Sequence, residues 1–310
     1  MIDIQDVEAA SARISPYVRR TPLLPATQLS KPFSPGELYL KLECLQPSGS
    51  FKARGAANKL FSVSPEEMKR GLVAASGGNH GLAVARSASL VGIPAHIYLP
   101  DNVLPDKIEK MKRWGATTVI AGKNYDDANG KALEHAQQTG ALYFHSFADP
   151  TIVAGQGTVG LEILEDLPDL DTIVVAIGGG GFITGTAVAL KAARPEIRVI
   201  GVEPVGSPTL HRSMETGNVV ELERVTTSVP TMACRRTDDA LFAQARTLID
   251  EIVLVEDEAM ARAAENLWFE FGLAADLSGA AAVAALSEGL VSVKPGEKVC
   301  APVCGAGLPF

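Results

Sequence analysis

A lysine lies in a short loop where the sequence changes from a strand pattern to a helix pattern. Lys52 stands within residues 48–55, with small residues before it and Arg54 two positions after it. Residues 38–43 alternate apolar and polar side chains like a half-buried strand, and a helical pattern begins at residues 55–60. A desolvated lysine loses its charge and can act as a nucleophile and base. Most lysines are ordinary surface residues, so the other motifs must decide its role.

Four consecutive glycines, Gly178, Gly179, Gly180 and Gly181, follow the apolar strand predicted at residues 172–177. Glycine lacks a Cβ, so the backbone N–H groups of such a run can turn toward an anion. The helix predicted after the run adds the positive end of its dipole. This arrangement predicts a phosphate site, because a tight turn alone would need only one or two glycines.

A dinucleotide is one possible source of that phosphate. No register of residues 178–185 satisfies Gly-x-Gly-x-x-Gly, but Glu203 ends the next predicted strand, where an acid could bind a ribose. A nicotinamide-dependent oxidoreductase therefore stays open as an alternative. Walker, nucleophile-elbow and zinc-protease motifs do not occur in the sequence.

A second glycine-bearing turn follows the strand predicted at residues 72–75. Its backbone N–H groups, at the start of a predicted helix, predict a nest for a substrate carboxylate. Asn79 can donate or accept a hydrogen bond, as a ring hydroxyl would require, whereas His80 on its own is more often structural. The candidate substrate-binding residues of this turn are Ser76, Gly77, Gly78, Asn79 and His80.

Composition excludes several classes of protein. The chain has 310 residues, 46% of them apolar, with a net charge of −8 and a pI near 5.2, which argues against a nucleic-acid platform. Its four cysteines form no Cys-x-x-Cys pair, and its five histidines are scattered, so no metal site is predicted. In an extended segment, Cys300 and Cys304 lie roughly 13 Å apart, too far for a disulfide. No apolar run is long enough to cross a membrane.

Short apolar runs alternate with helical patterns through most of the chain, which predicts βαβ units and parallel sheets. Residues 21–23 have the pattern of a loop, and residues 206–238 are irregular. Pro302 indicates a strand end or an edge strand. The predicted strands are residues 38–43, 72–75, 95–99, 118–121, 141–144, 172–177, 198–202 and 299–304, and the predicted helices include residues 6–18, 105–114, 126–139, 158–164 and 260–271.

Five motifs occur in the order found in one family of enzymes, and together they cover nearly the whole chain. They are Ser-x-x-Phe-Lys-x-Arg-Gly at residues 48–55, Gly-Asn-His-Gly at 78–81, the glycines at 178–181, Gly-Val-Glu-Pro at 201–204 and Cys-Gly-Ala at 304–306. The sequence thereby resembles the pyridoxal-phosphate enzymes of the serine/threonine dehydratase and serine racemase type. The resemblance implies an α/β, tryptophan-synthase-β-like fold (fold type II) with two open parallel-sheet domains. We expect a large domain of residues 1–68 and 148–310 and a small domain of residues 69–147.

The resemblance also implies roles for single residues. Lys52 would bind pyridoxal phosphate as a Schiff base and later move the Cα proton. The glycines at 178–181 would hold the cofactor phosphate, with Asn79 at the ring hydroxyl and Phe51 near the ring. Cys304 would face the pyridine nitrogen, where a neutral group restrains the electron sink and favours elimination.

The sequence departs from the family at four places. Gly77 replaces the serine that moves a proton in racemases, which favours elimination over racemisation. Glu203 matches a family metal ligand, but residues 205–210 contain no acid to complete the site. Asp276 stands where relatives carry a glutamate, and it is a candidate substrate-binding residue. Residues 235–236 are two arginines, which are either a solvated surface pair or a site for an extra substrate carboxylate.

The predicted function is that of a dehydratase, or ammonia-lyase, which eliminates the β-hydroxyl of a serine- or threonine-like amino acid to give a 2-oxo acid and ammonia. A modified or acidic hydroxy amino acid as substrate, an amino-acid racemase, and a cofactor-binding protein that has lost activity remain alternatives. We expect a cytoplasmic homodimer without a C-terminal regulatory domain.

Overall fold

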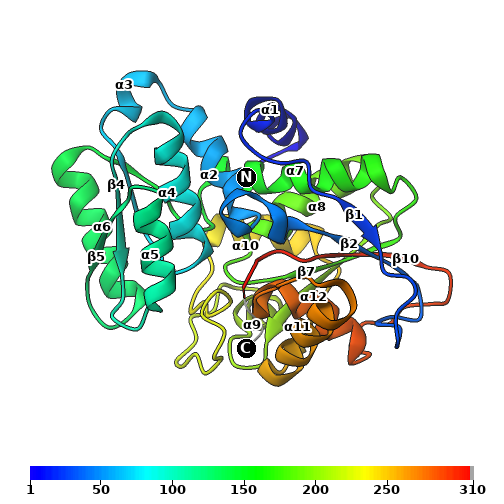
Figure 1. The fold of residues 1–310 in the computed structure, drawn as a ribbon. Helices are drawn as coiled ribbons and strands as arrows, with labels where there is room; N and C mark the ends of the chain where they lie inside the picture. Colours follow the sequence, from blue (N-terminus) through cyan, green and yellow to red (C-terminus); the bar gives the residue numbers. More distant parts are fainter. Residues whose placement is uncertain (308–310) are drawn as a thin grey trace.

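The computed structural model describes residues 1–307 and builds them around two separate β-sheets (Figure 1). The larger sheet has the strand order β1-β2-β10-β7-β8-β9. Only β1 runs antiparallel to its neighbour; the other pairs are parallel. Its strands are β1 (Leu23–Pro25), β2 (Glu37–Lys41), β7 (Thr172–Ala176), β8 (Arg198–Pro204), β9 (Glu251–Val255) and β10 (Lys298–Pro302).

The smaller sheet is wholly parallel and has the strand order β5-β4-β3-β6. It is the product of the regular alternation of strands and helices in the middle of the chain. Its strands are β3 (Leu72–Ala75), β4 (Ala95–Leu99), β5 (Thr117–Ile120) and β6 (Leu142–Tyr143). The predicted bounds of β3 and β4 are confirmed to the residue.

Helices cover both faces of the larger sheet. In Figure 1, α7 and α8 lie on one side of that sheet and α11 and α12 on the other. All five residues of β7 are buried, as its uninterrupted apolar pattern predicts for a strand covered on both faces. The helices are α1 (Ile4–Ile14), α2 (Lys52–Phe61), α3 (Pro65–Met68), α4 (Asn79–Val91), α5 (Pro105–Arg113), α6 (Tyr125–Thr139), α7 (Pro150–Asp166), α8 (Gly181–Ala193), α9 (Thr209–Thr216), α10 (Asp239–Leu248), α11 (Asp257–Phe271) and α12 (Leu277–Ser287).

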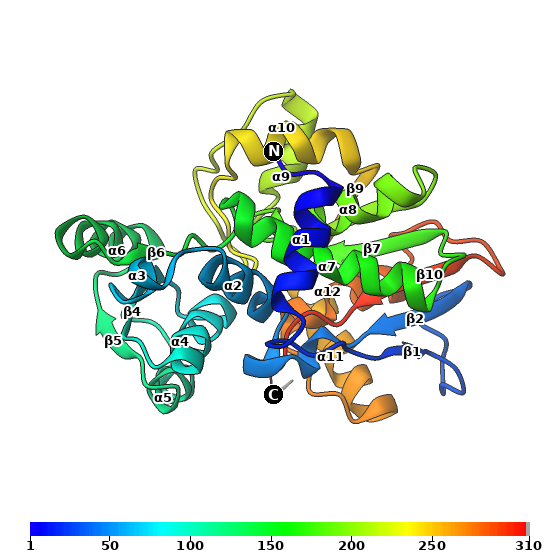
Figure 2. The ribbon, with the colours of Figure 1, turned by 90° about the horizontal axis from the view of Figure 1, so that it is seen from above.

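Helix α2 joins the two sheets. Figure 2 shows it between α7 and α4, and it contacts both. Ala56 and Leu60 of α2 belong to the apolar core of the smaller sheet, although the chain before residue 69 is predicted to belong to the large domain. The two-domain architecture agrees with prediction, while the boundaries at residues 68/69 and 147/148 stay a prediction.

The structure corrects several predicted elements. Leu23, expected to end a loop, instead begins the edge strand β1, and α9 lies within the segment expected to be irregular. Helix α1 ends at Ile14 and not near residue 18, because Pro16 lacks the N–H that would continue the helix. Strand β10 lies between β2 and β7 and ends at Pro302, so this proline marks a strand end and not an edge strand.

Candidate functional site

Lys52 is the first residue of α2, so the helix begins at the lysine and not three residues after it. Its half-buried side chain donates a hydrogen bond from Nζ to the carbonyl oxygen of Ser146 at 2.5 Å. Nζ also lies 5.1 Å from the centre of the Phe51 ring, which stacks on Phe182 at 4.0 Å. Burial away from water lowers the pKa of the Lys52 amine to about 8. A neutral amine, which a nucleophile and base requires, is therefore accessible near neutral pH.

The four glycines form the turn between β7 and α8. Gly180 has φ +97°, which favours glycine, and it caps α8 without any side-chain hydrogen bond. Within residues 1–307, the N–H groups of Gly179, Gly180 and Gly181 donate to no protein acceptor. These groups at a helix N-terminus are suited to hold a phosphate.

Close packing accounts for part of the glycine run. A Cβ on Gly179 would overlap the Phe147 ring, and a Cβ on Gly181 would overlap the Phe147 carbonyl oxygen. A Cβ on Gly178 would lie 2.9 Å from the Thr231 carbonyl oxygen. The number of glycines therefore reflects the approach of neighbouring segments as well as the anion site, a cause that the sequence pattern did not reveal.

Asn79 begins α4 and lies against the late Cys-Gly segment. Its Nδ2 donates to Oδ2 of Asp276 at 2.9 Å. A Cβ on Gly305 would lie 2.8 Å from Asn79 Nδ2 and 2.7 Å from Asp276 Oδ2, so only glycine fits beside this pair. The predicted residues Asn79, Asp276 and the neighbourhood of Cys304 are thus brought together.

Asp276 contacts the helix that follows it as well as Asn79. Its Oδ1 accepts hydrogen bonds from Gly279 N and Ser278 Oγ, both at 2.7 Å, and so caps the N-terminus of α12. A direct contact of Asp276 with substrate therefore stays a prediction, whereas its hydrogen bond with Asn79 is observed.

Cys304 is buried at the end of the segment that follows β10. Its Sγ donates to the Ser278 carbonyl oxygen at 3.4 Å, and its carbonyl oxygen accepts from Phe51 N at 3.2 Å. Burial raises the pKa of the thiol, which keeps it neutral. All four cysteines are free and buried, so the expectation that Cys300 and Cys304 do not form a disulfide is confirmed.

The turn at residues 76–81 has little space beside its glycines. Ser76 Oγ accepts from Gly78 N at 3.2 Å. A Cβ on Gly77 would overlap Cγ2 of Val103, and a Cβ on Gly78 would lie 3.2 Å from Thr231 Cγ2. The structure therefore places Thr231, which no sequence motif singles out, beside both glycine-bearing turns.

His80 has a structural contact. Its Nε2 hydrogen-bonds the Phe144 carbonyl oxygen at 2.9 Å. Burial lowers the pKa of this imidazole to about 3, so it is neutral in the physiological range. A direct role in binding substrate stays a prediction.

The two arginines at residues 235–236 form surface ion pairs. Arg235 pairs with Glu221 at 3.2 Å and Arg236 with Asp239 at 2.7 Å, and all four side chains are exposed. This geometry matches the solvated-pair interpretation and gives no support to recognition of a substrate carboxylate.

Glu203 holds a helix. Its two carboxylate oxygens accept from Leu210 N at 2.8 Å and His211 N at 2.7 Å, at the start of α9. Among the described residues no group of three or more acidic, histidine or cysteine side chains has the geometry of a metal site.

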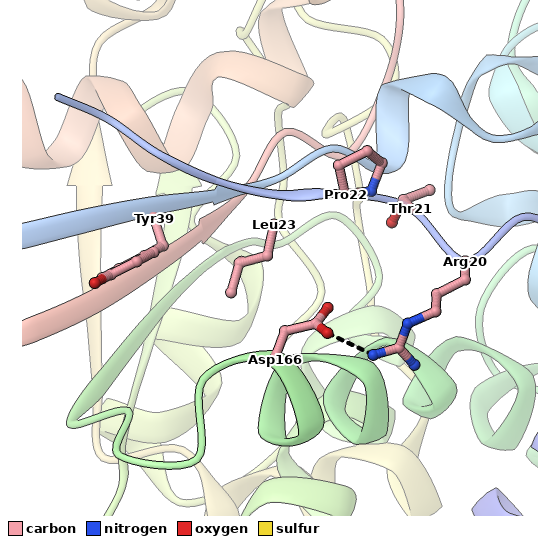
Figure 3. A pocket seen from close by; sticks show the side chains of 6 residues that line it. All are labelled: Arg20, Thr21, Pro22, Leu23, Tyr39 and Asp166. Atoms are coloured by element: carbon pink, nitrogen blue, oxygen red, sulfur yellow. Dashed lines mark hydrogen bonds and ion pairs between the residues drawn. The ribbon is translucent and has the colours of Figure 1, made fainter. Parts of the chain in front are cut away.

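Figure 3 shows a shallow pocket of about 430 Å³, and Lys52 is not among the residues that line it. It lies between the β1–β2 edge and the C-terminal end of α7, and none of its residues is a predicted site residue. Arg20 and Asp166 in its wall bind each other. Its lining residues are Arg20, Thr21, Pro22, Leu23, Tyr39 and Asp166.

The residues around Lys52 fit pyridoxal phosphate on the evidence of their geometry. The free N–H groups before α8 suit its phosphate, and the Asn79 amide suits a ring hydroxyl.

None of the helices in residues 1–307 has the length and hydrophobicity of a membrane span.

Known proteins agree with this fit. The family model of pyridoxal-phosphate dependent enzymes matches residues 14–305. The L-threonine ammonia-lyase of Thermotoga maritima is 41% identical over 308 residues, which are 99% of this chain and 76% of that protein. The structure of maize serine racemase matches with a TM-score of 0.93 at 34% identity, covering 99% of this chain and 94% of that one. The processed form of threonine deaminase isoform 2 from Solanum lycopersicum matches with a TM-score of 0.92 at 33% identity, covering 99% and 89%. The chain therefore belongs to the family of pyridoxal-phosphate dependent enzymes, and pyridoxal phosphate is its cofactor.

Proposed function

We propose that the protein is an ammonia-lyase that eliminates the β-hydroxyl of a threonine- or serine-like amino acid and yields a 2-oxo acid and ammonia. The observation that carries this proposal is the combination of one accessible base, Lys52, with a glycine at position 77, where a racemase of this family would carry a serine. Lys52 has an amine whose pKa is about 8, and Gly77 offers no side chain that could move a second proton. The named relatives include threonine ammonia-lyases, which supports this substrate class.

Different residues of the chain bind the cofactor and move the substrate proton. When bound, pyridoxal phosphate supplies an electron sink for the charge that develops at the substrate Cα. Lys52 binds the cofactor and takes the Cα proton. The N–H groups of residues 178–181 would hold the phosphate, and the Asn79 amide, which is hydrogen-bonded to Asp276, would bind the ring hydroxyl.

The remaining groups shape the site. The N–H groups of the turn at residues 76–80 bind the substrate carboxylate at the start of α4. Phe51, whose ring is stacked on Phe182, would pack near the cofactor ring. Burial keeps the Cys304 thiol neutral, and such a group beside the pyridine nitrogen would leave that nitrogen without a negative partner, which would favour elimination.

The alternatives have less support than the ammonia-lyase. Membership of the pyridoxal-phosphate family replaces the nicotinamide oxidoreductase alternative. Serine racemases occur among the relatives, but Val103 fills the space beside Gly77 where a second proton donor would stand. The exposed ion pairs of Arg235 and Arg236 offer no free guanidinium to an acidic substrate.

A substrate screen tests the proposal. The purified holoenzyme is assayed for 2-oxo acid release from serine, threonine, hydroxyaspartate and phenylserine, with Lys52→Ala as the control. We expect release from threonine or serine and none from the variant. A folded holoenzyme that racemises serine without releasing oxo acid would overturn the proposal.

We also propose a cytoplasmic homodimer with the domain boundaries given above. Four buried thiols without disulfides suit a reducing compartment such as the cytoplasm.

Trp268 and Phe269 are adjacent on α11, and their side chains are 46% and 77% exposed, which suits a dimer interface. Light scattering of the wild type and of Phe269→Glu tests the dimer: a dimeric wild type and a monomeric variant are expected, and a monomeric wild type would refute it.

A further inference from the structure

A buried network of four charged side chains holds the first turn of the helix that begins at Lys52. The Arg54 side chain is 1% exposed and binds two carboxylates as a fork. Its Nε and Nη2 donate to Glu43 at 2.8 and 2.7 Å, and its Nη1 and Nη2 donate to Glu162 at 2.7 and 2.9 Å. Both carboxylates therefore receive bidentate bonds, the geometry for which a guanidinium is suited.

The two carboxylates are themselves fixed. Glu43 is fully buried and accepts from Thr21 Oγ1 at 2.5 Å. Glu162 belongs to α7 and pairs with the fully buried Lys41 at 2.6 Å. Lys41 also lies 3.8 Å from Asp166, which pairs with Arg20, so the buried charges continue into ion pairs at the surface. The first turn of α2 is thus tied both to α7 and to the segment that follows β2.

We propose that Arg54 is a positioning residue for Lys52, because its fork fixes the start of α2 and so the direction in which the lysine side chain leaves the helix. The inference rests on the proposed role of Lys52. A buried ion pair seldom adds net stability over apolar packing of the same volume, so a stabilising role alone explains this network poorly. A fork with two anchored partners fixes direction, which a reacting amine requires.

Further contacts support this turn from other sides. Gly55 N donates to Gln156 Oε1 at 3.1 Å, and a Cβ on Gly55 would lie 2.5 Å from Gln156 Nε2. The residue before the lysine is held as well, because Phe51 N donates to the Cys304 carbonyl oxygen. The last turn of α2 has its own ion pair, Lys59 with Asp149 at 2.9 Å.

The test measures the pKa of the Lys52 amine in the full chain. The cofactor is released with hydroxylamine, the amine is trace-labelled with acetic anhydride across a pH series that brackets its titration, and peptide mass spectrometry gives the labelled fraction. Arg54→Lys keeps the charge but loses the fork, and Lys59→Gln removes the ion pair at the other end of the same helix. This readout needs neither substrate nor turnover, so it is independent of the proposed reaction.

We expect Arg54→Lys to raise the apparent pKa of Lys52 by about one unit toward that of a solvated lysine, since the freed side chain reaches water. We also expect roughly tenfold weaker rebinding of pyridoxal phosphate. Lys59→Gln should change neither quantity. If Arg54→Lys does not fold, Glu162→Gln, which weakens one of the two carboxylate contacts of Arg54, takes its place. It should shift the Lys52 pKa and the cofactor affinity in the same directions, but by less. A folded variant of either kind with an unchanged Lys52 pKa and unchanged cofactor affinity would overturn the proposal.

Discussion

Asn79 Nδ2 and Asp276 Oδ2 lie 2.9 Å apart, although 197 residues separate them in the sequence. The bond joins the start of α4, which packs on the smaller sheet, to the residue that caps α12, which packs on the larger sheet. One aspartate thus uses one oxygen to cap a helix and the other to orient an amide. The orientation of the Asn79 amide therefore depends on contact between the elements packed on the smaller sheet and those packed on the larger one.

Changes at Asp276 should separate these two tasks. Asp276→Ala removes the helix cap and should cost about 1 kcal/mol in the free energy of unfolding. Asp276→Ser keeps a capping oxygen but is too short to reach Asn79. Both variants should bind pyridoxal phosphate roughly tenfold more weakly, since each loses the hydrogen bond to the amide. Urea unfolding and a cofactor titration measure the two effects; a serine variant with wild-type affinity would remove Asp276 from the site.

Serine at position 77 should be harmful unless Val103 is also made smaller. The new Cβ would overlap Val103 Cγ2, so Gly77→Ser alone should lower the melting temperature. Gly77→Ser with Val103→Ala should recover most of that loss, and only the double variant should release D-serine from L-serine. Chiral chromatography and thermal unfolding report both results. A single variant that is stable and racemises would show that Val103 does not restrict this position.

Two glycine-to-alanine changes should have opposite effects. Gly179→Ala would overlap the Phe147 ring and should destabilise the fold by about 1–3 kcal/mol while weakening cofactor binding. Gly130 lies within α6 with no atom near its missing Cβ, so Gly130→Ala should stabilise by about 0.5–1 kcal/mol. Differential scanning calorimetry of the two variants measures these changes in stability. Equal effects would mean that the turn at Gly179 is less tightly packed than the structure indicates.

The pH dependence of catalysis should follow the amine of Lys52. Burial lowers its pKa to about 8, and only the neutral amine can take a proton. In the enzyme–substrate complex, where the substrate amine has taken the place of Lys52 and the lysine amine is free, kcat should therefore rise about tenfold per pH unit below a pKa of about 8 and level off above it. His80, with a pKa of about 3, should add no step near neutrality. A profile that His80→Asn shifts would contradict this assignment.

The sequence predicted the strands of the sheets better than the bounds of the helices that cover them. Strands such as β3 and β4 carry strong local patterns, whereas α7 begins at Pro150, well before its expected start at residue 158. Gly155 and Gly157 of α7 are buried against neighbouring backbone, so that stretch lacks the amphipathic pattern of a surface helix.

Candidate site residues could be named from the sequence where a local motif contained them. Lys52, Asn79 and the glycine run stand in local motifs, but Ser146, Thr231 and Val103 enter only through folding. Arg54 was noted as a second cation, yet its partners Glu43 and Glu162 lie elsewhere in the chain, and no periodic pattern links them. Long-range polar contacts of this kind leave no local trace in a single sequence.

The central claim is that Lys52 binds the cofactor and acts as the base. Borohydride reduction of the purified holoenzyme, followed by proteolysis and mass spectrometry, tests it most directly. We expect a pyridoxyl group on the peptide that contains Lys52, and none anywhere in a folded Lys52→Ala protein. A pyridoxyl group on another lysine of the wild type, or an unmodified Lys52 peptide in a fully loaded enzyme, would contradict it.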